Sequence, residues 1–532
     1  MIAQVQIKIG STWTDLSLDV VGESVKASWG IAGAAPGDRI ADPGTLQFDL
    51  DNSDGPGTPS GVPGDHVRGF YTPKHPDCMV GFEIGAEVRL VLVDPLLGSR
   101  VRWIGTVETA TPKPGVEDPR TVVSCVDWME EAARAKLKGI AVQTSIQSDA
   151  LFSLLVASMD RQPPDGVRSG TGSDIYPYAL DNTQDESSRI LSELQKIAMS
   201  EIGLVYVTAG QLVFEGRKMR GSAGSVRFAY DADRIKDAVI EYARDSILNR
   251  VQVSIHPRRV DPAATAVLFN LGSSQQIMRM TALVLDCPYR DPNQQAQRVG
   301  GMDLVTPAIT TDYLFNSQAD GLGTNLSSQL TVTYVGTPGG NTATVRAYNN
   351  GPLDGYLIML KLRGRGLYDF EPVLSDLQDD DSIAAYGENP LPYDMPYQSS
   401  PANAVDTAQF LLARNKDSVV RCSSLTFNAE WDDDARYQGF YADVSDRVSV
   451  TLPEAGLDAV QYFINGISLD IPISGPMTVT FMLSLPVDTS QFWLLGVAGR
   501  SELDFTTVLG YGLFAAGWIL GTSTLDDDTF LN

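Results

Sequence analysis

Carboxylates are the only abundant side chains in this sequence that could perform acid–base or metal chemistry. Three acidic runs stand out, Asp379–Asp381, Asp432–Asp434 and Asp526–Asp528. A glycosidase needs two carboxyl groups at a fixed separation across a cleft, and the sequence does not bring any two of these runs together. Adjacent aspartates in loops usually stay solvated. We therefore expect no catalytic pair and no metal site, and leave open a loosely bound ion at one of these clusters.

Residues 46–55, LQFDLDNSDG, are the place that most resembles a calcium loop. An EF-hand loop needs glycine at position 6 and a chelating glutamate at position 12. Counted from Asp49, these positions hold Asp54 and Ser60, so the EF-hand interpretation fails. Asp, Asn and Gly tolerate left-handed backbone after a strand. The stretch therefore predicts an alternating strand that ends in a turn.

Histidine and cysteine are too few and too scattered to predict a reaction centre. No HExxH pair, GxSxG elbow or phosphate-binding GxxxxGK[ST] loop is present. The four cysteines form no CxxC pair, which favours buried free thiols in a reducing compartment over zinc ligands or disulfides. We therefore predict that the chain is not an enzyme and has no cofactor. The residues concerned are His66, His75, His256, Cys78, Cys125, Cys287 and Cys422.

The charge balance excludes one broad class of partner. The 532 residues carry a formal net charge of -26, so the general surface should repel DNA and anionic membranes. Such a surface could line a conduit along which a polyanion slides, or it could serve solubility alone. The polar start, MIAQVQIKIG, does not fit a signal peptide. The longest apolar stretch near the end, GLFAAGWILG, is about half a membrane span, so we expect neither export nor a membrane span.

The elements that must position these side chains are mostly strands. Apolar–polar alternation with a period of two recurs between Gly, Pro and Asp clusters, which predicts a mainly β fold with helical insertions and several barrel-like antiparallel domains. Helices are predicted at a few places by their caps. Asp127 precedes WMEEAARAKL, Thr183–Glu186 forms a capping box before SSRILSELQKIAMSEI, and Ser400 with Pro401 opens ANAVDTAQFLLARN.

Composition shifts divide the chain into five predicted segments. A long loop over 52–78 interrupts the first, and the last contains two copies of a WxLGxSxLDxxTxL unit that begin at Trp493 and Trp518. The segments are a barrel-like domain over 1–143, a helical insert plus hairpin over 144–217, a second β-rich domain over 218–370, a connection with a helix and closing strands over 371–490, and the repeat over 491–532.

A series of short motifs resembles one family. The order G-T-L-x-F-x-L-D-N-S-D-G, followed by Tyr71-Thr-Pro-Lys-His-Pro76, is similar to the N-terminal region of hub-like minor tail proteins of long-tailed phages. An additional Gly/Pro-rich insertion over 56–70 departs from the compact family pattern. The motif residues of this turn and loop are Asp51, Asn52, Asp54, Gly55, Tyr71, Pro73 and Pro76.

The resemblance continues in order along most of the chain. Ile247-Leu-Asn-Arg-Val251 looks like the family's I-x-N-x-V strand, and the connection with Ser382, Tyr386 and Gly387 looks like its S-I-x-x-Y-G element. The closing WILGTSTLDDDTFL is similar to phage tail C-termini.

The resemblance implies a structural baseplate hub, or tail-tip protein, with barrel domains that imitate tail-tube subunits. Proteins of this family usually form a trimeric ring that joins the tail tube and distal tail protein to the tip or fibres. The implied partners also include the tape measure protein. DNA would leave through the bore without specific binding. The expected location is the virion tail, after assembly in the cytoplasm of the bacterial host.

Two other functions stay open at the level of sequence. Trp493 and Trp518 could stack on sugars in a receptor- or carbohydrate-binding tail protein. A role as core or docking residues is the more ordinary one for such tryptophans and is favoured. A tail-associated hydrolase that opens the cell wall is disfavoured, because no histidine constellation or placeable acid pair supports it.

Overall fold

The computed structural model describes residues 1–55, 60–115, 118–137, 140–180, 188–217, 219–220 and 226–485. Within these ranges the chain forms thirty β-strands and six α-helices. The predicted mainly β class with helical insertions is confirmed. Most strand pairs are antiparallel, but three are parallel, namely β9 with β12, β13 with β28 and β15 with β26.

The first module is a curved antiparallel sheet around a large apolar core. Strand β4 contains the expected alternation, because Leu46, Phe48 and Leu50 are buried while the residues between them face outward. This confirms the predicted strand that ends in a turn. The sheet runs in the order β3-β4-β7-β6-β5-β1-β2. The strands are β1 (Ile2–Ile9), β2 (Thr12–Asp15), β3 (Val20–Gly30), β4 (Thr45–Asp51), β5 (Glu87–Asp94), β6 (Gly98–Lys113) and β7 (Arg120–Val126).

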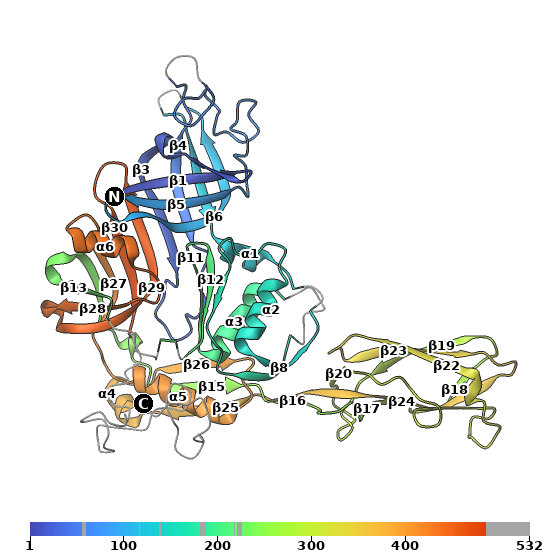
Figure 1. Cartoon of the computed structure of the whole chain (residues 1–532). Helices are drawn as coiled ribbons and strands as arrows, with labels where there is room; N and C mark the ends of the chain where they lie inside the picture. Colours follow the sequence, from blue (N-terminus) through green and yellow to red (C-terminus); the bar gives the residue numbers. More distant parts are fainter. Residues whose placement is uncertain are drawn as a thin grey trace.

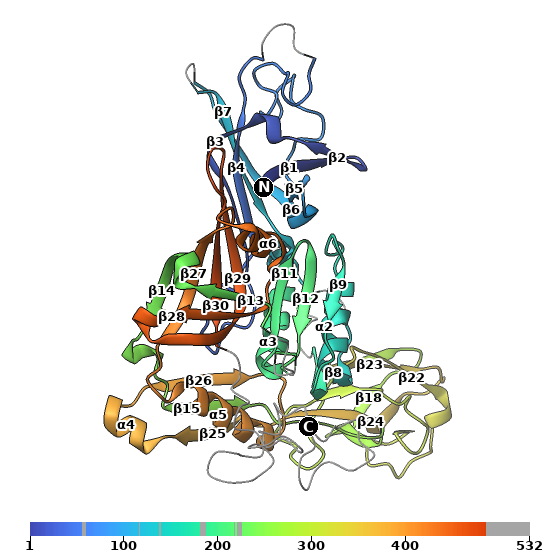
Figure 2. The same cartoon turned by 60° about the vertical axis from the view of Figure 1, so that its left-hand side comes forward.

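The second module combines two distant stretches of the chain. Strands β13 and β14 pair with β28 and β27, which lie about two hundred residues further on. Helix α6 covers this module near the first one (Figure 2). The elements are β13 (Phe228–Asp231), β14 (Ile235–Glu241), β27 (Arg421–Asn428), α6 (Asp433–Tyr441), β28 (Arg447–Leu452), β29 (Leu457–Pro472) and β30 (Thr478–Ser484).

The two modules share one continuous sheet. Strand β29 pairs antiparallel with β3, and Gly466 lies opposite Gly30 in this register. Gly30 has a φ of 88°, and a Cβ there would lie 2.5 Å from the carbonyl oxygen of Asn465. Only glycine therefore allows the close approach of the two strands. Thirteen strands are linked in this way.

The helical insert lies below the first module and beside the second module (Figure 1). Its helices pack on the β11–β12 hairpin, where Phe152 stacks on Phe214 at 5.0 Å between ring centroids. The predicted helix followed by a hairpin is confirmed, whereas the Thr183–Glu186 capping box lies outside the described residues. The elements are α1 (Trp128–Arg134), β8 (Gln143–Gln147), α2 (Ser148–Ala157), β9 (Val167–Ser169), β10 (Ile175–Ala179), α3 (Ile190–Glu201), β11 (Leu204–Thr208) and β12 (Gln211–Glu215).

A small base module lies below the second module in both views of the chain (Figures 1 and 2). Its three-stranded sheet packs on α5, whose N-cap Ser400 accepts a hydrogen bond from the Asn403 amide as the sequence predicted. The elements are β15 (Arg250–Ile255), β25 (Val373–Gln378), α4 (Asp380–Tyr386), β26 (Pro390–Met395) and α5 (Pro401–Asn415).

Residues 258–369 form an arm that projects from the body (Figure 1). The long strand β24 is its spine, and the arm has an apolar core of its own. The chain enters and leaves at one place, where the Phe370 amide donates to the Pro257 carbonyl at 3.1 Å. The strands are β16 (Arg258–Val260), β17 (Ala266–Asn270), β18 (Gln275–Ile277), β19 (Ala282–Pro288), β20 (Gly300–Met302), β21 (Tyr313–Asn316), β22 (Leu330–Gly336), β23 (Thr342–Asn349) and β24 (Gly355–Asp369).

The predicted β-rich domain over 218–370 is not one unit, because sheet pairing divides its strands among three modules. Strands β13 and β14 join the second module, β15 joins the base, and the rest forms the arm. No helix in the described ranges has the length and apolar character that a membrane crossing requires.

Candidate functional site

Asn52 organises the mouth of the long loop. Its side-chain oxygen accepts hydrogen bonds from the backbone amides of Gly69 (3.1 Å) and Tyr71 (3.0 Å). Its side-chain nitrogen donates to the hydroxyls of Thr72 (2.8 Å) and Thr121 (3.2 Å). This buried amide therefore fastens the end of β4 to the far end of the loop and to β7. The role is structural, since every polar atom of the side chain already has a partner.

Tyr71 anchors the loop from inside. Its ring is fully buried, and its hydroxyl donates to Asp19 at 2.5 Å. The Asp19 carboxylate also accepts from the Gly64 amide at 2.9 Å and lies 3.4 Å from Nε2 of His66. The His66 ring in turn stacks on Phe70 at 4.8 Å between centroids.

Charge pairing sets the protonation of this cluster. Burial alone would raise the pKa of Asp19, but hydrogen bonds from His66, Tyr71 and the Gly64 amide lower it below its ordinary value. Burial would lower the pKa of His66, but the hydrogen bond and the charge of Asp19 raise it. Asp19 and His66 are therefore both charged in mildly acidic solution, where their ion pair holds the loop in place.

The remaining predicted loop residues make local contacts. Asp51 accepts from the Ser53 amide at 2.9 Å, Asp54 accepts from the Arg68 amide at 2.8 Å, and the Gly55 amide donates to the His66 carbonyl at 2.7 Å. Pro73 is half-buried and Pro76 is exposed. The turn interpretation of the acidic stretch agrees with these contacts, which use its carboxylates to bind backbone amides.

Two motif elements from distant parts of the sequence meet at Asn249. Its side-chain nitrogen donates to the Gly387 carbonyl at 2.8 Å and lies 3.4 Å from the Ser382 hydroxyl, while its side-chain oxygen accepts from the Asn389 amide at 2.8 Å. Ser382 also donates to the Lys416 carbonyl at 2.6 Å. Asn249 thereby ties β15 to both ends of α4.

The other two predicted residues of this connection behave differently. Gly387 ends α4 with a φ of 81°, a left-handed value that favours glycine. Tyr386 is exposed, with 40% of its surface accessible. It is therefore the member of the motif that is free to contact a partner.

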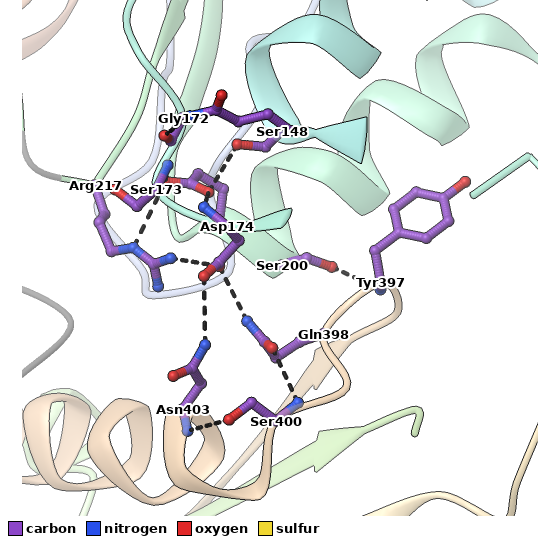
Figure 3. A network of polar contacts seen from close by, with 12 residues as sticks. Ser148, Gly172, Ser173, Asp174, Ser200, Arg217, Tyr397, Gln398, Ser400 and Asn403 are labelled. Atoms are coloured by element: carbon purple, nitrogen blue, oxygen red, sulfur yellow. Dashed lines mark hydrogen bonds and ion pairs between the residues drawn. The ribbon is translucent and has the colours of Figure 1, made fainter. Parts of the chain in front are cut away.

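A buried ionic network joins the helical insert to the base (Figure 3). The Arg217 guanidinium pairs with Asp174, and its Nε lies 3.6 Å from Glu201. Glu201 accepts from the Ser148 hydroxyl at 2.9 Å and from the Ser173 amide at 2.9 Å. Three charged side chains are thus held away from water with their charges paired.

The base completes the same network from its own side. Figure 3 shows Gln398 and Asn403 pointing at the Asp174 carboxylate, to which they donate at 3.0 and 3.3 Å. The Tyr397 amide donates to the Ser200 hydroxyl at 2.8 Å. Burial and the neighbouring Glu201 charge raise the pKa of Asp174 against the opposing effect of Arg217. This network is a buried polar joint between the two modules.

The acidic runs act as helix caps. Asp379 accepts from the Ser382 amide at the start of α4, and Asp432 accepts from the Ala435 amide at the start of α6. The third run, Asp526–Asp528, lies outside the described residues, as do Trp493 and Trp518. Within the described ranges, no group of three or more His, Cys, Asp or Glu side chains could hold a metal ion.

The cysteines have the character of core residues. All four are free, and Cys125, Cys287 and Cys422 are buried. Burial raises the pKa of Cys287 to about 12 and that of Cys422 to about 11, so both thiols stay protonated near neutral pH. A nucleophilic role is therefore disfavoured for these two residues.

Sequence reasoning missed the residues that hold the modules together. Asn249 was visible only as part of a strand motif. Glu201 and Arg217 were visible only as members of the predicted helix and hairpin, and Asp174 stood in no motif. The available signal was the type of residue: a charged side chain inside an apolar helix or hairpin pattern, such as Glu201 beside Ile197 and Ala198, often marks a buried ion pair.

Solved structures of phage tail proteins are among those similar to this chain. The 43 kDa tail protein of prophage MuSo2 from Shewanella oneidensis has 10% identity and a TM-score of 0.48, over 91% of this chain and 98% of that chain. A tail protein from Neisseria meningitidis MC58 has 10% identity and a TM-score of 0.47, over 91% and 97%. Prophage tail protein gp18 from Listeria monocytogenes has 9% identity and a TM-score of 0.40, over 91% and 94%.

All three neighbours are described as tail proteins. No family model and no curated protein matches the chain. Because the TM-scores lie below 0.5, the functional proposal rests on the chain's own residues and architecture.

Proposed function

We propose that this chain is a structural hub protein of a phage tail. In this role it forms a ring at the tail end that joins the tail tube and the distal tail protein to the tip or fibres. By family resemblance the ring holds three copies. The ordered motif series, from the turn at Asp51–Gly55 to the connection at Ser382–Gly387, is the sequence basis for the proposal.

The observation that carries the proposal is the sheet shared by the two β modules. Proteins of the family that the motifs resemble contain barrel domains that imitate tail-tube subunits, and β1–β7 and β27–β30 supply two curved sheets fused through β3 and β29. A fused pair can present two tube-like surfaces in a fixed orientation. The arm and the base, which are inserted into this frame, are then available for other contacts.

The acidic charge fits the passage of DNA. With a net charge of -26, a bore lined by this chain would repel phosphates and let the polymer slide. We expect acidic residues to outnumber basic ones on the bore surface. A bore lined mainly by lysine and arginine would contradict this part of the proposal.

Electron cryomicroscopy of purified particles tests the proposal directly. The expected result is density for this chain as a ring at the end of the tail tube, in contact with the neighbouring tail proteins. A particle that lacks the chain, together with a free monomer in the lysate, would overturn it. A muralytic band from the pure chain in a zymogram would instead revive the hydrolase hypothesis.

A further inference from the structure

A cavity of about 730 Å³ lies where the second module, the base and the helical insert meet. Its volume is within the range of small-ligand sites, roughly 300–1,000 Å³. Five arginines are among its lining residues, although the chain as a whole is strongly acidic. These arginines are Arg39, Arg217, Arg220, Arg414 and Arg421.

Arg414 is at the centre of this cluster and has no carboxylate partner in an ion pair among the described residues. Its guanidinium donates to the backbone carbonyl of Leu485. Burial, together with repulsion from Arg39, Arg421 and Arg220, lowers the pKa of Arg414 to about 9. The side chain is therefore still charged near neutral pH, in a place where its neighbours carry the same sign.

Several guanidinium nitrogens in the cavity lining have no hydrogen-bond partner among the residues that the structure describes. These buried atoms are Nη1 and Nε of Arg217, Nη2 of Arg220 and Nε of Arg421. The Arg217 side chain is only 1% exposed. Buried donors without acceptors cost free energy, and native proteins rarely keep them without water or a ligand to bind.

Among the described residues, the carboxylates of the lining form an ion pair with only one of the five arginines, Arg220. Glu215 is already used, because it accepts from Tyr206 and Ser445 as well as from Arg220. Asp38 accepts from the Ala35 amide in its own loop. Glu241 and Asp245 also line the cavity, but neither forms an ion pair with an arginine of the lining among the described residues. Within the described part of the chain, no carboxylate forms an ion pair with Arg39, Arg414 or Arg421; Glu241 lies opposite Arg421 in the pairing of β14 with β27 and acts on it at longer range.

We propose that this cavity binds an anionic ligand with two or more oxyanion groups, carboxylate or phosphate, between Arg414, Arg39 and Arg421. The planar guanidinium fork matches both kinds of group and binds them through two parallel hydrogen bonds. The ligand would relieve the repulsion among these arginines and give the free Nε donor of Arg421 an acceptor. The inference is independent of the proposed role in a phage tail.

Isothermal titration calorimetry on the full chain tests the site, with sodium pyrophosphate and with citrate as separate probes at matched ionic strength. We expect at least one probe to bind, and Arg414→Gln and Arg39→Gln to weaken that binding about ten- to a hundredfold, because each removes a charge-assisted partner. Arg346→Gln is the matched control, since Arg346 is exposed on β23 of the arm and should leave binding unchanged.

The two probes distinguish the sources of the ligand. Tighter binding of pyrophosphate identifies a phosphorylated ligand, and tighter binding of citrate identifies a carboxylate ligand such as an acidic peptide segment. If Arg414→Gln fails to fold, Arg39→Gln decides the question, because Arg39 lies in a partly exposed loop. The absence of binding by both probes, or equal affinity in all variants, would overturn the proposal.

Discussion

At the scale of single residues, Asn52 has the largest structural consequence in the N-terminal loop. Replacing it with alanine leaves the amides of Gly69 and Tyr71 without acceptors in a buried place. We expect Asn52→Ala to reduce the free energy of unfolding by on the order of 3 kcal/mol. Thermal unfolding, together with limited proteolysis within 60–78, measures the loss and shows whether the loop is released.

Asp54→Ala is the matched control for this loop. Asp54 is exposed and accepts one hydrogen bond from the Arg68 amide. Its replacement should change stability by less than about 0.5–1 kcal/mol. If both variants lose the same stability, Asn52 does not hold the loop in the way described.

The His66–Asp19 pair makes the loop sensitive to pH. Because the pKa of His66 is raised in the folded state, protonated His66 adds to the free energy of unfolding. This stabilisation is fully present below about pH 6.5 and is lost as the pH rises through the folded-state pKa of His66. The lowered pKa of Asp19 gives a second stabilisation, which is present above about pH 4 and is lost as the pH falls further. Hydrogen exchange of the Gly64 and Gly69 amides should therefore speed up, beyond its intrinsic pH dependence, as the pH rises above about 6.5. His66→Gln should abolish this extra dependence, and an unchanged profile would contradict it.

The sequence allowed the turn at Asp51–Gly55 to be predicted, because its residue types are those of a turn. It did not allow the partners of Asn52 to be predicted. Thr121 lies 69 residues away along the chain, and the two meet only because β4 pairs with β7. Local chemistry is therefore readable from sequence, whereas a contact that depends on sheet order is not.

At the scale of elements, the Arg217 network fixes the helical insert on the base. Arg217→Met removes the positive partner and leaves Asp174 and Glu201 buried together. Breaking such a pair on one side typically costs about 3–5 kcal/mol. Arg161→Met, which removes the exposed pair with Glu131, should cost at most about 1 kcal/mol. Denaturant unfolding of both variants measures the difference.

The loss in Arg217→Met should depend on pH. The pKa of Asp174 is already raised, chiefly by burial, so the folded state binds this proton more tightly than the unfolded state does. Proton binding by Asp174 therefore favours the folded state at low pH, and this stabilisation is lost as the pH rises. We expect the deficit of Arg217→Met to be smaller at pH 5 than at pH 8. An equal decrease in the free energy of unfolding at pH 5 and pH 8 would show that the destabilisation does not come from the buried carboxylates.

The helices and hairpins were predictable because each depends on a local pattern. Asp127 and Ser400 cap their helices as expected, and the alternation in β4 fixes which face is buried. The pairing of β13 and β14 was not predictable, because their partners come after the base and the arm in the chain. Nothing in a local pattern states which distant strand will complete a sheet.

At the scale of the whole molecule, the arm should be a separable unit. Its apolar contact with the body is a small cluster in which Leu367 and Val260 meet Val142 and Tyr178. Replacing 258–369 by a short Gly-Ser-Gly link between Pro257 and Phe370 should leave the other modules folded. Circular dichroism and thermal unfolding of the shortened chain check this.

The isolated arm provides the complementary test. Residues 256–371 contain a complete apolar core and adjacent ends, so we expect a cooperative thermal transition for this fragment alone. A fragment without a cooperative transition, together with a shortened chain that aggregates, would show that arm and body fold only as one unit.

The joint between β3 and β29 has a consequence for the order of events during synthesis. The two paired strands are about 440 residues apart, so β3 emerges from the ribosome long before its neighbour exists. At roughly 5–20 residues per second, its edge stays open for roughly 20–90 s. An unpaired strand edge is a template for wrong pairing with another nascent chain. Slowing translation after β7 should therefore increase aggregation, and co-expressed chaperones that shield nascent chains should reverse the effect.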